Sequence, residues 1–180
     1  IMDYTDRTVC CLFGDGAGAA VYEWSDTQQG IRASFMRAEG DKGDALFAQA
    51  FTPCDTLHKQ GRQQMDFLKM DGHAVFRFTA KAVPNAIDGV LKKADLDIDQ
   101  VDWVVPHQAN ARILEMVSRR YGVPMEKIFS NVDKVGNTSS ASIPICLDQM
   151  RRSGLLLPGQ TAIFVGFGGG LTYGAILIQM

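Results

Sequence analysis

The sequence predicts an α/β protein, and three observations lead to this prediction. Apolar runs typical of strands alternate with helical patterns through the second half of the chain. Glycine and proline residues separate these runs, as turns require. The last two apolar runs flank Gly168–Gly170, which is the pattern of a β-hairpin. With 180 residues, 46% of them hydrophobic and 21% charged, the chain is one domain or part of a larger protein with a sizeable core.

Three strands are expected in the N-terminal part, over residues 8–13, 19–24 and 31–38, followed by a long polar loop over residues 39–64. The stretch GDGAGA, Gly14–Ala19, fits the G-x-G-x-x-A fingerprint of dinucleotide-binding proteins. That fingerprint needs a helix directly after it, whereas here the β-branched and aromatic stretch AAVYEW follows. We therefore expect a tight connection between two strands and no nucleotide site.

The remaining elements follow from periodicity and stop signals. A helix should begin near Asp71 and Gly72 and run to about Ala94, with a kink at Pro84. A second helix should follow His107 and stop at Gly122. The other predicted elements are a strand over 101–105, a short strand in KIFSNV (127–132), a helix after GNTSSAS ending near Gly154, and the hairpin strands TAIFVGF (161–167) and LTYGAILI (171–178).

Composition excludes several classes of function. The net charge of −2 and the pI of about 5.9 argue against a nucleic-acid partner, and no apolar run reaches the 18 residues of a membrane span. Between His107 and Arg152, seven basic residues face four acidic ones. This local excess is either a docking patch for an acidic partner or a phosphate, or an ordinary solvated surface, and charge alone favours the surface.

The cysteines and the first residue of the chain give weaker indications of cellular compartment and processing. Cys10, Cys11, Cys54 and Cys146 form no CxxC pair, so we interpret them as small hydrophobic residues of a protein in the reducing cytoplasm. Because no His, Cys or acidic cluster has ligand spacing, we expect no metal. The chain starts at Ile1 without a signal-peptide pattern, which suggests a fragment or a processed product.

Three loop motifs lie where an apolar run gives way to a turn or a helix. PHQAN follows the strand over 101–105, GNTSSAS follows KIFSNV, and GFGGG follows TAIFV. Parallel strands collect such loops at their carboxyl ends, so His107, Asn137 and the Gly168–Gly170 turn are expected in one crevice. Each also has a structural explanation, as a packed histidine, a helix N-cap and a hairpin turn. The prediction of a site rests on their combination.

The stretches FGDGAGAAV, PHQANARI, GNTSSASIP and GFGGGLTYGA together resemble the β-ketoacyl-[acyl-carrier-protein] synthase III family. The resemblance covers nearly the whole chain in the same motif order. Condensing enzymes that elongate fatty acids have a second histidine where Asn137 stands, and plant-type polyketide synthases have different flanking residues. The resemblance implies a thiolase-like α/β fold, with residues 1–27 as the last strands of an N-terminal half and residues 28–180 as the C-terminal half.

The family implies a cytoplasmic, homodimeric acyltransferase that starts fatty-acid synthesis without a cofactor. A cysteine takes an acyl group from acyl-CoA, and malonyl-acyl carrier protein then loses CO2 and attacks the thioester. Negative charge develops on the malonyl thioester oxygen, so hydrogen-bond donors are needed there. His107 and Asn137 suit this role as the catalytic pair. The position of His107 at the start of a helix should keep its ring neutral.

Other positions are carried over from the family motifs, one by one. Arg7 in TDR resembles the arginine that packs on the adenine of CoA, and Arg112 resembles an arginine of carrier-protein docking. Gly169 resembles the backbone donor to the acyl-cysteine oxyanion. Three more residues resemble those lining the pantetheine tunnel and its inner end: Gly72, Asn110 and Phe167. His73 departs from the asparagine often found beside that glycine.

The family's nucleophilic cysteine lies in an ACAGF-like motif, and no such motif occurs here. Three explanations stay open. The chain is a fragment of a complete condensing enzyme whose N-terminal half is missing, a non-catalytic module that binds acyl carrier protein or CoA, or one subunit of a split polyketide-type synthase. In each case the edges of the strands over 8–13 and 19–24 call for another polypeptide to pair with them. The primer acyl group and the choice between fatty-acid and polyketide pathways stay open as well.

Overall fold

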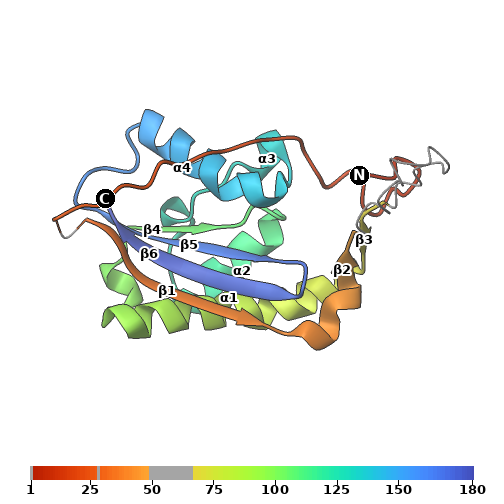
Figure 1. Cartoon of the computed structure of the whole chain (residues 1–180), viewed down its shortest axis with the longest axis horizontal. Helices are drawn as coiled ribbons and strands as arrows, with labels where there is room; N and C mark the ends of the chain where they lie inside the picture. Colours follow the sequence, from red (N-terminus) through yellow and green to blue (C-terminus); the bar gives the residue numbers. More distant parts are fainter. Residues whose placement is uncertain (1, 28, 49–66) are drawn as a thin grey trace, which may run out of the picture.

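A four-stranded mixed sheet organises the protein, in the order β1-β6-β5-β4. The computed structural model describes residues 2–27, 29–48 and 67–180. Strand β4 runs parallel to β5, and the other two pairs are antiparallel. A separate antiparallel pair, β2 with β3, lies at one end of the molecule (Figure 1). The strands are β1 (Gly30–Ala38), β2 (Leu46–Phe47), β3 (Lys69–Met70), β4 (Trp103–Pro106), β5 (Thr161–Gly168) and β6 (Thr172–Gln179).

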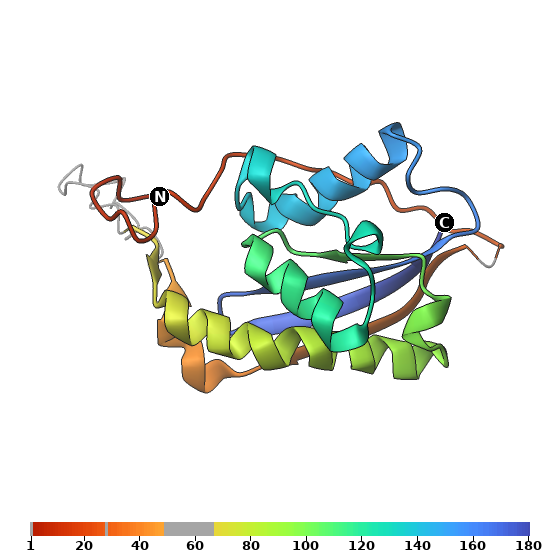
Figure 2. The ribbon, with the colours of Figure 1, turned by 180° about the vertical axis from the view of Figure 1, so that it is seen from behind.

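Helices cover both faces of the sheet and give three layers. Helices α1 (Gly72–Ala94) and α2 (Ala111–Tyr121) lie on one face, and α4 (Ser142–Arg152) lies on the other with the short α3 (Val132–Val135) beside it (Figures 1 and 2). None of the helices among the described residues is both long and apolar enough to cross a membrane. The described residues also contain four short 3-10 turns: η1 (Gly40–Ala45), η2 (Ile98–Gln100), η3 (Met125–Lys127) and η4 (Ser139–Ala141).

The continuous apolar run of β5 follows from burial on both faces. Ile163 and Val165 belong to the core shared with α1 and α2, whereas Ala162 and Phe164 belong to the core under α4. Side chains of a strand alternate between faces, so a strand with helices on both sides has no position for a polar residue. This explains why the hairpin strands were visible in the sequence, and the predicted hairpin is confirmed.

Helix boundaries agree with the predicted signals. The Asp71 carboxylate accepts a hydrogen bond from the Ala74 N–H at 2.9 Å and caps α1, which continues through Pro84 to Ala94. Helix α2 ends at Tyr121 and is capped by Gly122, whose φ of 64° only glycine adopts at little cost. Helix α4 ends at Arg152, close to the predicted stop at Gly154.

The strands predicted over 8–13, 19–24 and 127–132 are wrong. Residues 8–13 form turns, and only Phe13 makes a bridge, with Asn137. Residues 19–24 are extended but pair with no strand among the described residues. The third segment contributes one bridge, between Ile128 and Val104. An apolar pattern indicates that a segment can enter a sheet, but a strand also needs a neighbour for its hydrogen bonds. The predicted loop over 39–64 contains η1 and β2, and the rest of it lies outside the described residues.

The glycines of GDGAG are explained by close packing rather than by a turn between two strands. The segment is extended and lies along α3 and α4 (Figure 1). A Cβ atom at Gly14 would stand 2.0 Å from the Val135 carbonyl oxygen, and one at Gly18 would stand 2.4 Å from Cβ of Pro144. Alternate residues of an extended chain share a face, so Gly14, Gly16 and Gly18 together let the backbone approach the helices.

We expect Gly14→Ala to lower the free energy of unfolding by about 1–3 kcal/mol, because its methyl group would overlap a backbone carbonyl that has little room to move. Gly40→Ala is the matched control, since a Cβ at Gly40 meets nothing within 4 Å. Urea denaturation of both variants measures the difference. Equal stability of the two variants would contradict the packing explanation.

Candidate active site

The candidate site lies where the parallel strands β4 and β5 end. Pro106 of β4 pairs with Val165 of β5, and the backbone N–H of His107 continues this ladder by donating to the Val165 carbonyl at 2.7 Å. The Gly168–Gly170 turn follows β5 at the same edge of the sheet. The predicted gathering of these two loops is therefore present in the structure.

The third loop reaches the site by another route. Asn137 follows α3 rather than a strand, and its backbone is held by the N-terminal segment. Its N–H donates to the Leu12 carbonyl at 2.9 Å, and its carbonyl accepts from the Gly14 N–H at 2.9 Å. Residues more than 120 positions apart in the sequence thus fix the backbone of Asn137.

One cavity of about 1710 Å³ connects these loops. It extends from the ends of β4 and β5 to the start of α1 and the β2–β3 pair. Arg7 does not line it, although the adjacent Thr8 does. The other seven predicted site residues all line this cavity: Gly72, His107, Asn110, Arg112, Asn137, Phe167 and Gly169.

His107 is a buried histidine with one ring nitrogen already occupied. Its Nδ1 lies 2.6 Å from Oγ of Ser142, and its ring meets the Phe167 ring edge to face at 5.1 Å between centroids. Burial lowers the pKa of His107 from 6.5 to about 4, so the ring is neutral at physiological pH. Desolvation alone accounts for this shift, and the predicted contribution of the helix dipole stays a prediction. Helix α2 begins at Ala111, four residues after His107.

The amide of Asn137 is oriented by its own loop. Its Oδ1 accepts a hydrogen bond from the Ser139 N–H at 2.9 Å. Ser139 presents this N–H from a φ of 53°, a conformation that non-glycine residues adopt at a cost and that often marks functional sites. With the oxygen engaged, the NH2 end of the buried Asn137 amide remains to meet a ligand.

The remaining predicted residues have identifiable local positions. Asn110 is the N-cap of α2, and its Oδ1 accepts from the Ile113 N–H at 3.2 Å. A Cβ at Gly169 would stand 3.2 Å from the Leu46 carbonyl oxygen, so glycine permits this close approach. Gly72 is the first residue of α1, and a Cβ there would meet nothing within 4 Å. Arg112 is exposed at the start of α2, and Arg7 is exposed in the N-terminal segment.

None of the cysteines among the described residues lines the cavity. Cys146 is on the buried face of α4, and this burial raises the pKa of its thiol to about 12. Neither Cys10 nor Cys11 lines the cavity, and Cys54 lies outside the described residues. In the described part of the chain, no group of three His, Cys, Asp or Glu side chains could hold a metal ion.

Sequence reasoning missed two serines of the GNTSSAS loop. Ser139 orients Asn137, and Ser142 contacts His107. The signal available in the sequence was the density of small hydroxyl residues beside Asn137, which also fits a helix start. Their pairing with particular site residues depends on the tertiary structure, because Ser142 and His107 are 35 positions apart.

Two family models match the chain. Residues 91–180 match the model described as 3-oxoacyl-[acyl-carrier-protein (ACP)] synthase III C terminal. Residues 1–40 match the model described as 3-oxoacyl-[acyl-carrier-protein (ACP)] synthase III.

Curated and solved proteins agree with these models. The chain is 41% identical over 180 residues to β-ketoacyl-[acyl-carrier-protein] synthase III of Clostridium perfringens, covering 99% of this chain and 55% of the relative. The crystal structure of 3-oxoacyl-[acyl-carrier-protein] synthase III from Aquifex aeolicus VF5 matches with a TM-score of 0.87 and 36% identity, covering 99% of this chain and 54% of that one. The priming β-ketosynthase of the R1128 polyketide biosynthetic pathway matches with a TM-score of 0.81 and 37% identity, covering 99% and 54%. The fold is therefore thiolase-like, as predicted, and the chain spans about half the length of its curated relatives.

We expect the His107 ring to stay neutral from pH 8 down to about pH 5 and to titrate with a midpoint near 4. The unfolded ring binds a proton below about 6.5 and the folded ring only below about 4, so this group destabilises the fold as pH falls through that window. An NMR titration of the ring resonances, assigned with the His107→Asn variant, measures the midpoint. A midpoint near 6.5 would contradict the burial of an uncharged ring.

Proposed function

Since this chain belongs to the 3-oxoacyl-[acyl-carrier-protein] synthase III family, we propose that it is the C-terminal portion of a decarboxylating condensing enzyme. The enzyme joins an acyl group from acyl-CoA to malonyl-acyl carrier protein and releases a β-ketoacyl product, as in the initiation of fatty-acid synthesis. One observation carries the proposal. His107 and Asn137 line the same cavity, and each has one end of its polar group held by a serine.

The chemistry needs donors at one oxygen. When the malonyl thioester loses CO2, the electron pair of the broken C–C bond moves into an enolate, and negative charge develops on the thioester oxygen. The enolate carbon then attacks the acyl-cysteine carbonyl, forms the new C–C bond and expels the cysteine thiolate. Hydrogen-bond donors fixed near the enolate oxygen lower the barrier, and each is worth about 3–4 kcal/mol.

Two donors with suitable chemistry face this cavity. The Asn137 amide presents its NH2 end, because Ser139 engages its oxygen. The His107 ring, neutral because it is buried, can donate through one nitrogen without carrying a charge. Decarboxylation itself creates the nucleophile, so His107 acts as a donor and no general base is required. An imidazolium would place a positive charge in a desolvated site at considerable cost.

The surroundings of the cavity suit a long thioester substrate. Phe167 meets the His107 ring at the inner end, and Gly72 and Asn110 line the wall along which the pantetheine chain is proposed to run. Gly169, which tolerates close backbone approach, is the proposed backbone donor to the acyl-cysteine oxyanion. At the rim, exposed Arg112 is the proposed contact of the acidic carrier protein, and exposed Arg7 is the proposed contact of the CoA adenine.

The nucleophilic cysteine is proposed to come from an N-terminal half that pairs with residues 1–27. Three large apolar side chains of the unpaired segment support this idea, since Val21, Tyr22 and Trp24 are 97%, 73% and 90% exposed. An extended apolar segment with free backbone groups is a typical site for a further strand. The complete enzyme is proposed to be a homodimer, as the family resemblance implies.

In the complete enzyme, His107→Ala or Asn137→Ala should slow decarboxylation of the malonyl thioester by about 10²–10³, because one donor to the enolate oxygen is lost. Transfer of the acyl group from acyl-CoA to the cysteine should remain measurable. Release of CO2 and labelling of the cysteine by acyl-CoA are followed separately. An equal loss of both half-reactions would contradict this division of roles.

Peptide mapping of the complete enzyme after reaction with acyl-CoA locates the acyl group. We expect it on a cysteine outside these 180 residues, because Cys10, Cys11 and Cys146 do not line the cavity and the Cys146 thiolate is disfavoured by burial. An acyl group on any of the four cysteines of this chain would contradict the proposed split of the site between two halves.

A further inference from the structure

The contact between Ser142 and His107 is the most deeply buried polar contact of the site. Ser142 is 1% exposed, it is the first residue of α4, and its hydroxyl lies 2.6 Å from Nδ1 of His107. Whichever of the two groups donates decides which nitrogen of the ring carries its proton.

The two possible donor assignments differ in whether the buried Ser142 hydroxyl proton has an acceptor. If the Ser142 hydroxyl donates to Nδ1, its proton is used and the ring proton resides on Nε2. If Nδ1–H donates instead, the hydroxyl proton has no acceptor among the described residues, because its one hydrogen bond there is to His107. An unsatisfied buried hydroxyl costs about 1–3 kcal/mol, so the first arrangement is favoured.

We propose that Ser142 is a positioning residue that donates to Nδ1 of His107 and thereby places the ring proton on Nε2. This inference rests on the proposed function, because it assigns the donor atom of that mechanism. Within the described residues Nε2 has no other hydrogen-bond partner, and His107 lines the cavity. Nε2–H is then the atom that meets the developing enolate oxygen.

The same loop orients both catalytic groups. Ser139 supplies an N–H to the acceptor end of the Asn137 amide, and Ser142 supplies an O–H to the acceptor nitrogen of the His107 ring. In each case a loop donor occupies the acceptor and leaves a donor for the cavity. Residues 137–142 thus convert two side chains that could accept or donate into two donors.

Ser142→Ala removes the hydroxyl with the smallest change of shape. In the complete enzyme, we expect decarboxylation of the malonyl thioester to fall about three- to tenfold, the effect of one neutral hydrogen bond, with acyl transfer to the cysteine little changed. ¹⁵N NMR of the ring should show Nε2 protonated and Nδ1 unprotonated in the unmodified enzyme. In Ser142→Ala the two nitrogens should become mixed in protonation.

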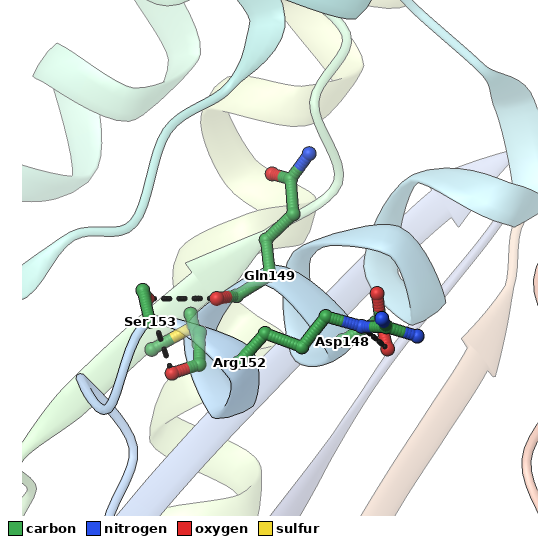
Figure 3. A network of polar contacts seen from close by, with 5 residues as sticks. Asp148, Gln149, Arg152 and Ser153 are labelled. Carbon is green, nitrogen blue, oxygen red and sulfur yellow. Dashed lines mark hydrogen bonds and ion pairs between the residues drawn. The ribbon is translucent and has the colours of Figure 1, made fainter.

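Ser153→Ala is the matched control. Ser153 lies just after the other end of α4, where its hydroxyl donates to the Gln149 carbonyl at 2.7 Å (Figure 3). It removes a serine hydroxyl bonded near the end of the same helix, away from the cavity. We expect both half-reactions and the His107 tautomer to be unchanged in this variant.

Three results would overturn the inference: a proton on Nδ1 in the unmodified enzyme, an unchanged decarboxylation rate in Ser142→Ala, or an equal loss of both half-reactions in Ser142→Ala and Ser153→Ala. The tautomer is read without turnover, so it separates this inference from the proposed function. If His107→Ala left decarboxylation intact, the function would fail while the Ser142 contact could still hold.

Discussion

The parallel pairing of β4 with β5 is the constraint on which the site depends. It aligns the carboxyl ends of two strands, and the His107 N–H extends the ladder by one bond to Val165. Because β5 alternates its side chains, Phe167 lies two residues beyond Val165 on the same face and meets the His107 ring. Strand β5 therefore holds His107 twice, through the Val165 carbonyl at its backbone and the Phe167 side chain at its ring, and Ser142 contacts Nδ1 of the ring. A shift of one residue between β4 and β5 would turn Phe167 away and break this arrangement.

Burial of polar groups explains why the site presents hydrogen-bond donors to the cavity. A buried amide or imidazole is costly unless its polar atoms find partners. In Asn137 and His107 one end of each group is satisfied by a serine, Ser139 for the amide and Ser142 for the ring, and both residues line the cavity. The desolvation that keeps His107 uncharged also strengthens any hydrogen bond to a developing anion, because the local dielectric is low. Neutrality and donor strength thus come from the same burial.

The sequence predicted what depends on local patterning and missed what depends on distant partners. The run TAIFV was identified as a strand because both of its faces are buried, and Asp71, Gly122 and Gly154 marked helix ends through their own backbone preferences. The crevice of His107 and Gly168–Gly170 followed from the general geometry of parallel strands. Residues 19–24 have a strand pattern without a neighbouring strand among the described residues, so the pattern alone misled. The Ser142 contact spans 35 positions and has no local signature.

The N-terminal segment links the site to residues 19–24, where the N-terminal half of the enzyme is proposed to pair. Its backbone makes two hydrogen bonds to the backbone of Asn137, through Leu12 and Gly14. Its glycines allow it to lie against α3 and α4. These bonds hold the segment firmly at Asn137, yet a few residues later it exposes Val21, Tyr22 and Trp24. A strand added along residues 19–24 would therefore order the same backbone that positions the Asn137 amide. In the proposed enzyme, docking of the N-terminal half and positioning of Asn137 are then coupled steps, because one short extended segment serves both.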